Sequence, residues 1–338
     1  MVKICVIGAG VNGLTCALKI KEKYKDFDVT IFSDEFTPNT TGDGSGGLWY
    51  PYLCGDTSQE NLTKWGIETY SFLYDLWYTG GKHISLMPMY ELYRQKKQLS
   101  RPLWADLVFG YRELDMRQLD YLSTMHSVEY SAGRTFTTFV IQAPKLLEYL
   151  YKRFKDANGE VATAKITSLS DPLLQEFRVI VNCTGLRARD VVPDTRVFPI
   201  RGQIARVKAP WLNYTIVDED SGHYIIPNDA ICVLGGTHQN NDYRTEIDAG
   251  NTGFILNGCR QMIPSLKSVE VVKHWVGLRP GRDEIRLEAE ERKGKIYIHN
   301  YGHGGSGLTL FWGCGENVLQ LLEQNLGSIK PHDAKSKL

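Results

Sequence analysis

A glycine pattern near the amino terminus has the spacing that a dinucleotide phosphate requires, in Gly8-Ala9-Gly10-Val11-Asn12-Gly13. Gly8 allows a tight turn, Gly10 lets the backbone approach a pyrophosphate, and Gly13 lets a helix pack closely on the preceding strand. The helix would offer free N–H groups and the positive end of its dipole to phosphate. The pattern predicts a bound dinucleotide over a plain turn, but it does not distinguish NAD from FAD.

An acidic residue follows the next apolar run at the position where an acid binds a ribose hydroxyl. The run Val29–Phe32 ends in Ser33-Asp34-Glu35. Asp34 or Glu35 therefore lies near the distance from the glycine pattern that dinucleotide sites use.

A second glycine cluster stands before the last helical pattern of the chain. Four glycines fall within the six residues 302–307, after the apolar run Ile296–His299. A glycine-rich helix start suits an anion or the oxygen face of a flavin ring, whose reduced form carries negative charge. The alternative is a structural helix with a flexible entry. His303 has the chemistry of a general base, although hydride loss from a neutral amine needs none.

One arginine stands where a carboxylate anchor would be expected. Arg279 closes a predicted strand and precedes Pro280. Its fork can bind a carboxylate bidentately, where a lysine would offer only a point charge. A surface arginine is the alternative, and Arg282 and Arg286 compete for the role. Tyr224 could add a hydroxyl, although a buried core tyrosine fits the pattern equally well.

The elements that must position these residues predict an α/β fold. We expect a doubly wound, Rossmann-like FAD-binding domain and a second, antiparallel-sheet substrate domain. The FAD-binding domain is expected to be discontinuous and to comprise 1–50, 140–195 and 288–330. The substrate domain is expected at 51–139 and 196–287. Strands are predicted at 83–93, 108–114, 137–142, 160–169, 178–185, 198–207, 214–217, 223–226, 231–234, 271–278 and 296–299, and helices at 59–76, 143–154, 253–262 and 310–326.

Composition excludes several classes of protein. Lys+Arg and Asp+Glu are both 39, so the formal charge of zero argues against a general nucleic-acid or anionic-membrane surface. No apolar run approaches bilayer length, and the immediate strand leads us to expect no signal peptide. The seven cysteines are scattered and form no CxxC. We therefore expect reduced, mostly buried thiols in an intracellular protein, without a metal site or disulfide framework.

The polar tail 331–338 ends in Ser336-Lys337-Leu338. A terminal S-K-L is a peroxisomal import address, so we expect the import receptor as a partner and the peroxisomal matrix as the location. A chance tripeptide is the alternative. Peroxisomes house oxidases that make hydrogen peroxide, which favours flavin over NAD. A homodimer is compatible with the sequence, which does not determine the oligomeric state.

These motifs together resemble the D-amino-acid oxidase and D-aspartate oxidase family of FAD enzymes over almost the whole chain. The matching segments are Val6–Val11, Phe36-Thr37-Pro38, Gly47-Leu48-Trp49, Pro51-Tyr52, Val181–Gly185, Arg201-Gly202-Gln203, Leu234-Gly235-Gly236, Arg279-Pro280 and His299–Gly305. The last segment and the order of the whole set are highly specific to the family.

The resemblance implies oxidative deamination of a D-amino acid. Arg279 and Tyr224 would hold the substrate carboxylate, and the carbonyl of Gly305 would accept from the amine. The α-hydrogen would leave as hydride to flavin N5, without an essential acid or base. The imino acid would hydrolyse to a 2-oxo acid and ammonia, and molecular oxygen would be reduced to hydrogen peroxide.

The resemblance also implies a set of cofactor-binding residues. They are Gly8, Ala9, Gly10, Gly13, Asp34, Thr40, Thr41, Gly46, Gly47, Leu48, Ile166, Thr184, Gly304, Gly305, Ser306, Gly307, Leu308 and Thr309.

Departures from the family pattern bear on the substrate side chain. Tyr50 stands where the enzymes for neutral substrates carry glutamine, and the lid segment 218–223 is short. Val217 and His238 stand where the enzymes for acidic substrates carry arginines. We therefore expect a preference for neutral D-amino acids, with Tyr50 and His238 in the substrate site. The alternatives are a D-aspartate oxidase and a glycine/sarcosine-type flavin amine oxidase or dehydrogenase, with an NAD-dependent or non-catalytic module as a further class.

Overall fold

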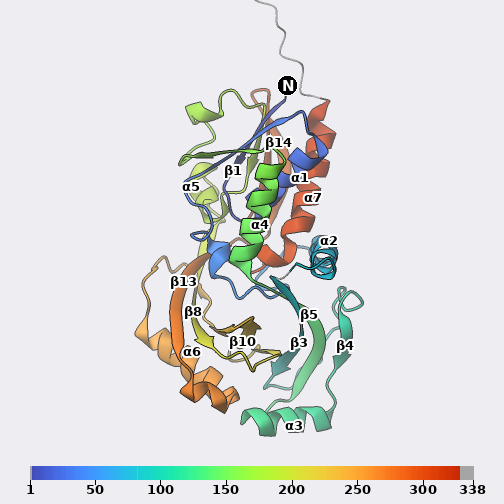
Figure 1. The fold of residues 1–338 in the computed structure, drawn as a ribbon, viewed down its shortest axis with the longest axis vertical. Coiled ribbons are helices and arrows are strands. Elements are labelled where there is room, and N and C mark those ends of the chain that lie inside the picture. The colour runs from blue at the N-terminus through green and yellow to red at the C-terminus, as the bar shows by residue number, and fades with distance from the viewer. Residues whose placement is uncertain (1, 82, 328–338) are drawn as a thin grey trace, which may run out of the picture.

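The computed structural model describes residues 2–81 and 83–327, which form two β-sheets with their helices (Figure 1). Among the described residues, the strands of the first sheet lie in the order β14-β15-β7-β1-β2-β6. Its strands are β1 (Lys3–Ile7), β2 (Asp28–Ser33), β6 (Glu160–Thr163), β7 (Val179–Asn182), β14 (Arg286–Arg292) and β15 (Lys295–Tyr301).

The first sheet is the doubly wound sheet that the sequence predicts. β1 pairs in parallel with β2 on one side and with β7 on the other, so the strand order reverses at β1. Ligands bind outside the carboxyl ends of the strands at such a switch point. β14 is the antiparallel edge strand, paired with β15.

Three helices cover one face of this sheet (Figure 1). They are α1 (Val11–Lys23), α4 (Ala143–Asp156) and α7 (Gly307–Leu326), and α1 contacts both of the others. The helix α4 shows why they pack: Leu146, Leu147, Leu150 and Phe154 recur at helical spacing and are fully buried. This buried stripe fixes α1, and therefore the glycine turn that begins it, against the sheet.

The second sheet is mainly antiparallel and has the order β12-β8-β11-β10-β9-β3-β5-β4, with β13 paired to β8. One pair, β3 and β9, is parallel. Its strands are β3 (Ile84–Tyr93), β4 (Phe109–Glu113), β5 (Ala132–Ile141), β8 (Phe198–Lys208), β9 (Thr215–Asp218), β10 (His223–Asn228), β11 (Ile231–Gly235), β12 (Gln239–Asn240) and β13 (Val271–Gly281).

The remaining helices lie around the two sheets. α3 (Met116–His126) and α6 (Ala249–Met262) lie at the second sheet, at the lower end in Figure 1. α2 (Gln59–Tyr78) packs along α7. Shorter helices are α5 (Ala188–Val191), η1 (Thr41–Gly44), η2 (Pro172–Leu174), η3 (Gly185–Arg187) and η4 (Pro264–Ser268).

Most predicted elements are confirmed, and the differences include one strand end and several elements that were not predicted. The strand predicted at 160–169 ends at Thr163, since only the first four residues pair with β2. The helix α3 and the strand β14 were not predicted. The division into domains stays a prediction, although its boundary at 287/288 falls inside β14 and α2 packs on α7 rather than within the second sheet.

Two bulk properties complete the description. All seven cysteines are buried thiols, as predicted. In the described part of the chain, no helix is both long enough and apolar enough to cross a bilayer.

Candidate active site

The glycine turn at the carboxyl end of β1 has the geometry that its sequence predicts. Gly8 has φ +103°, and a Cβ there would lie 2.5 Å from the carbonyl oxygen of Cys183. A Cβ on Gly13 would lie 1.9 Å from the carbonyl oxygen of Gly8, so only glycine lets α1 pack this closely on the turn. Ala9 between them is buried.

The space beside this turn fits a dinucleotide phosphate. A Cβ added to Gly10 would meet nothing within 4 Å, and no side chain caps the start of α1 there. Gly307 at the start of α7 is equally open, with only Val11 at 4.0 Å. Buried polar atoms without a partner, Asn12 Oδ1 and His303 Nε2, lie in the same two segments. Open glycines, uncapped helix starts and orphaned polar atoms are what a bound pyrophosphate and flavin would complete.

Three residues predicted to bind the cofactor, Asp34, Ile166 and Thr184, lie near the carboxyl ends of β2 and β7. Asp34 is exposed and forms an ion pair with Arg187, which also donates to the carbonyl oxygen of Ile166 at 2.8 Å. Thr184 donates from Oγ1 to Asn182 Oδ1 at 2.7 Å. Arg187 is a neighbour of Asp34 that the sequence alone did not suggest, because 153 residues separate the two.

The glycine-rich loop after β2 is ordered by its own side chains. Thr40 bonds Asp43 through both its backbone N–H (2.8 Å) and its hydroxyl (2.7 Å), which caps the short helix that begins at Thr41. Gly47 has φ +78°, and a Cβ there would lie 1.9 Å from the carbonyl oxygen of Ile141.

This loop then passes into the second sheet. Leu48 bridges to Val140 of β5, and the Trp49 backbone N–H donates to Phe139. Gly46 lies against Ile226, since a Cβ there would be 2.8 Å from its Cδ1. The loop therefore links the two sheets.

The second glycine cluster is bonded to the segment that follows this loop. Ser306 Oγ donates to the Tyr52 carbonyl oxygen at 2.9 Å and accepts from its N–H at 2.7 Å. Thr309 Oγ1 donates to the Tyr50 carbonyl oxygen at 3.0 Å. These two buried hydroxyls are thus used by the chain itself, and Leu308 between them is also buried.

The carboxylate candidate Arg279 adjoins this cluster. The backbone N–H of Gly304 donates to the Pro280 carbonyl oxygen at 2.9 Å, so the residue after Arg279 is tied to the glycine cluster. The Tyr52 ring lies against exposed Gly305, where a Cβ would be 2.5 Å from its Cδ1.

Arg279 and Tyr224 are brought together over glycines. The Arg279 guanidinium covers Gly202, and the Tyr224 ring covers Gly235 and Gly236, positions where a Cβ would collide with them. Arg279 donates to the Thr237 carbonyl oxygen at 3.0 Å and to the Tyr224 hydroxyl. Burial raises the pKa of Tyr224, and Arg279 partly opposes this. Among the described residues no carboxylate forms an ion pair with Arg279.

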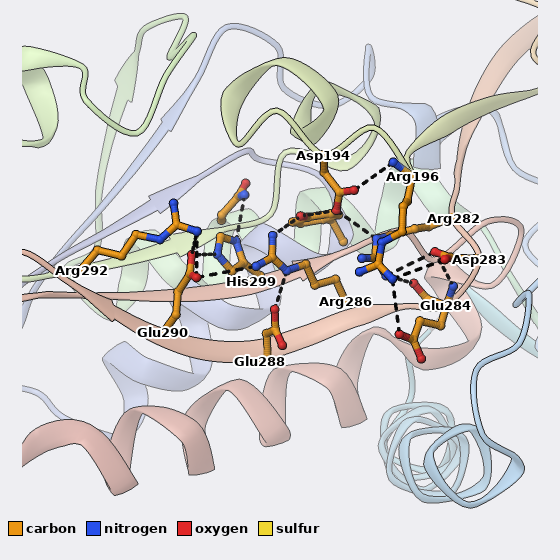
Figure 2. A network of polar contacts seen from close by, with 12 residues as sticks. Asp194, Arg196, Arg282, Asp283, Glu284, Arg286, Glu288, Glu290, Arg292 and His299 are labelled. Atoms are coloured by element: carbon orange, nitrogen blue, oxygen red, sulfur yellow. Dashed lines mark hydrogen bonds and ion pairs between the residues drawn. The ribbon is translucent and has the colours of Figure 1, made fainter.

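The competing arginines are already paired. Figure 2 shows Arg282 and Arg286 in a network of polar contacts at β14 and β15. Arg282 is 1% exposed and bonds Asp194 at 3.0 Å. Arg286 bonds Glu288 at 2.6 Å and the Tyr301 hydroxyl at 2.8 Å. Of the three candidates, only Arg279 has a charge left for a ligand.

Tyr52 and Glu219 were not predicted as site residues, and both lie close to residues that were. Tyr50 donates to Glu219 Oε1 at 3.0 Å. Burial raises the pKa of Tyr52 to about 12, with Arg279 acting against it and Tyr224 and Glu219 adding to it. Tyr52 therefore lies within electrostatic range of both Arg279 and Glu219. The acidic run around Glu219 looks like a solvated turn in sequence, so nothing local marks it.

The positions of Val217, His238 and Arg244 bear on whether an acidic substrate side chain would meet a cation. Val217 is buried opposite Tyr224. His238 is exposed and lies beside Gly222, 3.6 Å from a Cβ there. Arg244 is bonded to Asp242 at the surface, at 2.6 Å. Arg244 and Arg282 are therefore both paired with carboxylates of the chain itself.

His303 lies under the glycine cluster as a neutral ring. It is 2% exposed, and burial lowers its pKa to about 4. Its only polar neighbour in the described residues is Asn12, with 3.3 Å between Asn12 Nδ2 and His303 Nδ1. A ring so placed positions the two glycine segments rather than exchanging protons near neutral pH.

Comparison with known proteins identifies the class to which this fold and site belong. The family model of FAD-dependent oxidoreductases, abbreviated DAO, matches residues 3–321. The chain belongs to this family, and FAD is its cofactor.

Its relatives include oxidases of two kinds. A D-amino acid oxidase of Dugesia ryukyuensis is 38% identical over 96% of this chain and 98% of its own. The D-aspartate oxidase of Homo sapiens is 34% identical over 99% of both chains. Among solved structures, the glycine oxidase of Geobacillus kaustophilus has a TM-score of 0.78 at 17% identity and covers 99% of this chain and 100% of its own. That likeness shows the fold alone.

Proposed function

We propose that the protein oxidises D-amino acids to 2-oxo acids, ammonia and hydrogen peroxide with bound FAD. The observation that carries this proposal is Arg279, a half-buried guanidinium that has no acidic partner among residues 2–81 and 83–327. It is bonded to Tyr224 and tied through Pro280 to the glycine cluster. An unpaired guanidinium beside a tyrosine hydroxyl is a receptor for a carboxylate. The relatives named D-amino acid oxidase support the choice of substrate class.

The chain's own residues orient the substrate. Arg279 and Tyr224 hold the carboxylate, and the exposed backbone of Gly305 offers a carbonyl to the amine. The Tyr52 ring lies against Gly305 at this end of the site. FAD, held by the glycine turn and the glycine cluster, supplies the hydride acceptor. Burial lowers the pKa of His303, the candidate base, to about 4, which supports a mechanism that works by orientation.

The proposal favours neutral over acidic side chains. An acidic side chain that leaves water needs a cation, because an unpaired carboxylate is heavily penalised. Val217 supplies none, His238 is exposed, and Arg244 and Arg282 are paired. Glu219 adds a negative charge at this end.

Oxygen uptake and peroxide release by the purified flavoprotein test the proposal. We expect turnover with D-alanine and D-methionine and none with the L-enantiomers. Uptake with glycine or sarcosine but not with larger D-amino acids would move the protein to the other amine oxidases. Electron transfer to an artificial acceptor without peroxide would make it a dehydrogenase.

Localisation and assembly stay predictions. Ser336, Lys337 and Leu338 lie outside the described residues, so import by the peroxisomal receptor rests on the motif alone. A fluorescent protein carrying residues 328–338 should enter peroxisomes, and loss of the last three residues should abolish entry. Light scattering of the purified protein would show whether it forms a homodimer.

A further inference from the structure

Glu219, whose carboxylate bonds the predicted site residue Tyr50, carries a second charge without a counter-ion among the described residues. This residue directly follows β9, and its backbone N–H donates to the Leu92 carbonyl oxygen at 3.0 Å. Its half-buried carboxylate accepts a hydrogen bond from Tyr50 at 3.0 Å. No cation in the described residues forms an ion pair with it.

Strand register relates the end of β9, just before Glu219, to the proposed carboxylate anchor. Tyr224 of β10 lies opposite Val217 of β9, and Val217 lies opposite Glu91 of β3. Val217 therefore lies beside Tyr224 in the sheet, and Glu219 follows two residues later, directly after β9, with its carboxylate bonded to Tyr50. Tyr52, which senses the charges of both Arg279 and Glu219, links the two ends.

The other charges near Glu219 do not neutralise it. Glu91 is fully buried and is bonded by Arg134 at 2.6 Å and 2.7 Å, so these two cancel. Lys97 is exposed, with its ammonium 4.4 Å from the centre of the Tyr93 ring. Burial and the nearby Glu91 raise the pKa of Glu219, against the opposing effects of Tyr50, Arg134 and Lys97. One negative charge remains at this end of the site.

We propose that Glu219, bonded by Tyr50, is the residue that pairs with the side-chain cation of a basic D-amino acid such as D-lysine or D-arginine and so sets the preference for a charged over a neutral side chain of the same length. This proposal rests on the proposed function. Arg279 would hold the substrate carboxylate at one end, and the Glu219 carboxylate would pair with the side-chain ammonium or guanidinium at the other. The Tyr50 hydroxyl keeps the carboxylate turned toward the site.

Pairs of substrates of similar size that differ in side-chain charge isolate the effect of that charge. D-Lysine is compared with D-norleucine, and D-arginine with D-citrulline, in oxygen-uptake assays of the holoenzyme. In Glu219→Gln, which keeps the shape and the bond to Tyr50, we expect the ratio of kcat/KM for each charged substrate over its neutral partner to fall about tenfold to a hundredfold. The control Glu270→Gln removes an equal charge from an exposed surface pair with Lys208 and should leave both ratios unchanged.

A binding measurement on the wild-type holoenzyme needs neither turnover nor a variant. 6-Aminohexanoate and hexanoate both carry a carboxylate and lack the α-amine, so neither can be deaminated. We expect the aminated compound to perturb the flavin spectrum at lower concentration.

The results separate the two proposals. Ratios in Glu219→Gln within twofold of wild type, or tighter binding of hexanoate than of 6-aminohexanoate, would overturn the role of Glu219. Turnover of D-norleucine would then still support the proposed function. No turnover of any D-amino acid by wild type would instead overturn the proposed function itself.

Discussion

Replacing Arg279 tests the anchor of the whole mechanism. Arg279→Ala removes a guanidinium that the described residues pair only with a carbonyl oxygen and a tyrosine hydroxyl. Loss of one partner from a desolvated charge pair costs about 3–5 kcal/mol, and about 1.4 kcal/mol corresponds to a factor of ten. We therefore expect kcat/KM for D-alanine to fall by about two to three and a half decades, mostly through KM. Steady-state oxygen uptake at saturating oxygen measures both constants.

The flavin must stay bound for this result to concern the substrate. Arg279→Ala should keep the visible spectrum and flavin content of wild type, because the glycine turn lies on other elements. Arg279→Lys keeps the charge but loses the fork, so its loss should be smaller. Arg292→Ala removes an exposed guanidinium paired with Glu290 and is the matched control. A KM for Arg279→Ala within threefold of wild type would remove Arg279 from the site.

Three further predictions concern the cofactor, stability and specificity. Gly10→Val should fold but lose flavin, since a Cβ at residue 10 meets no protein atom within 4 Å, whereas Gly13→Ala should lower the thermal midpoint because its Cβ meets Gly8. Flavin absorbance measures the first effect and calorimetry the second. Full flavin content in Gly10→Val would contradict the placement of the cofactor at the glycine turn. Buried His126, with its pKa lowered to about 4, binds fewer protons than the unfolded chain between pH 4 and 6.5, so stability falls as pH falls. His126→Phe should remove about 2 kcal/mol of the unfolding free energy lost between pH 7.5 and 5 in denaturant titrations, and an unchanged loss would refute this. The kcat/KM ratio of D-methionine to D-aspartate at mildly alkaline pH should exceed one, and a value well below one would place the protein with D-aspartate oxidases.

The parts of the site that could be predicted are those with a short local sequence pattern. The glycine turn, the glycine cluster and the strand-end Arg279 each depend on a few consecutive residues, because a turn or a helix start needs glycine at fixed positions. The structure shows why, since a Cβ at Gly8 or Gly13 would collide with backbone atoms.

Elements defined by distant contacts could not be predicted in the same way. β14 reads RLEAEER, a charged sequence that forms a strand because it is an edge paired with β15. α3 does have a local helix-start signal, the capping box formed by Asp115 and Gln118, although the helix was not predicted. Glu219 meets Tyr50 across 169 residues, so only the folded chain shows that pair.

The buried charges of this protein fall into two groups: those paired within the fold, which serve the structure, and those left unpaired, which are available to a ligand. Arg134 is bonded to Glu91, and Arg282 to Asp194, so each of these ions is compensated within the fold. Arg279 and Glu219 are also removed from bulk water in part, yet the described residues give neither a counter-ion. Leaving a charge uncompensated costs stability, so a fold gains from such residues only when a ligand completes them. A D-amino acid with a cationic side chain would complete both, with its carboxylate at Arg279 and its ammonium or guanidinium at Glu219.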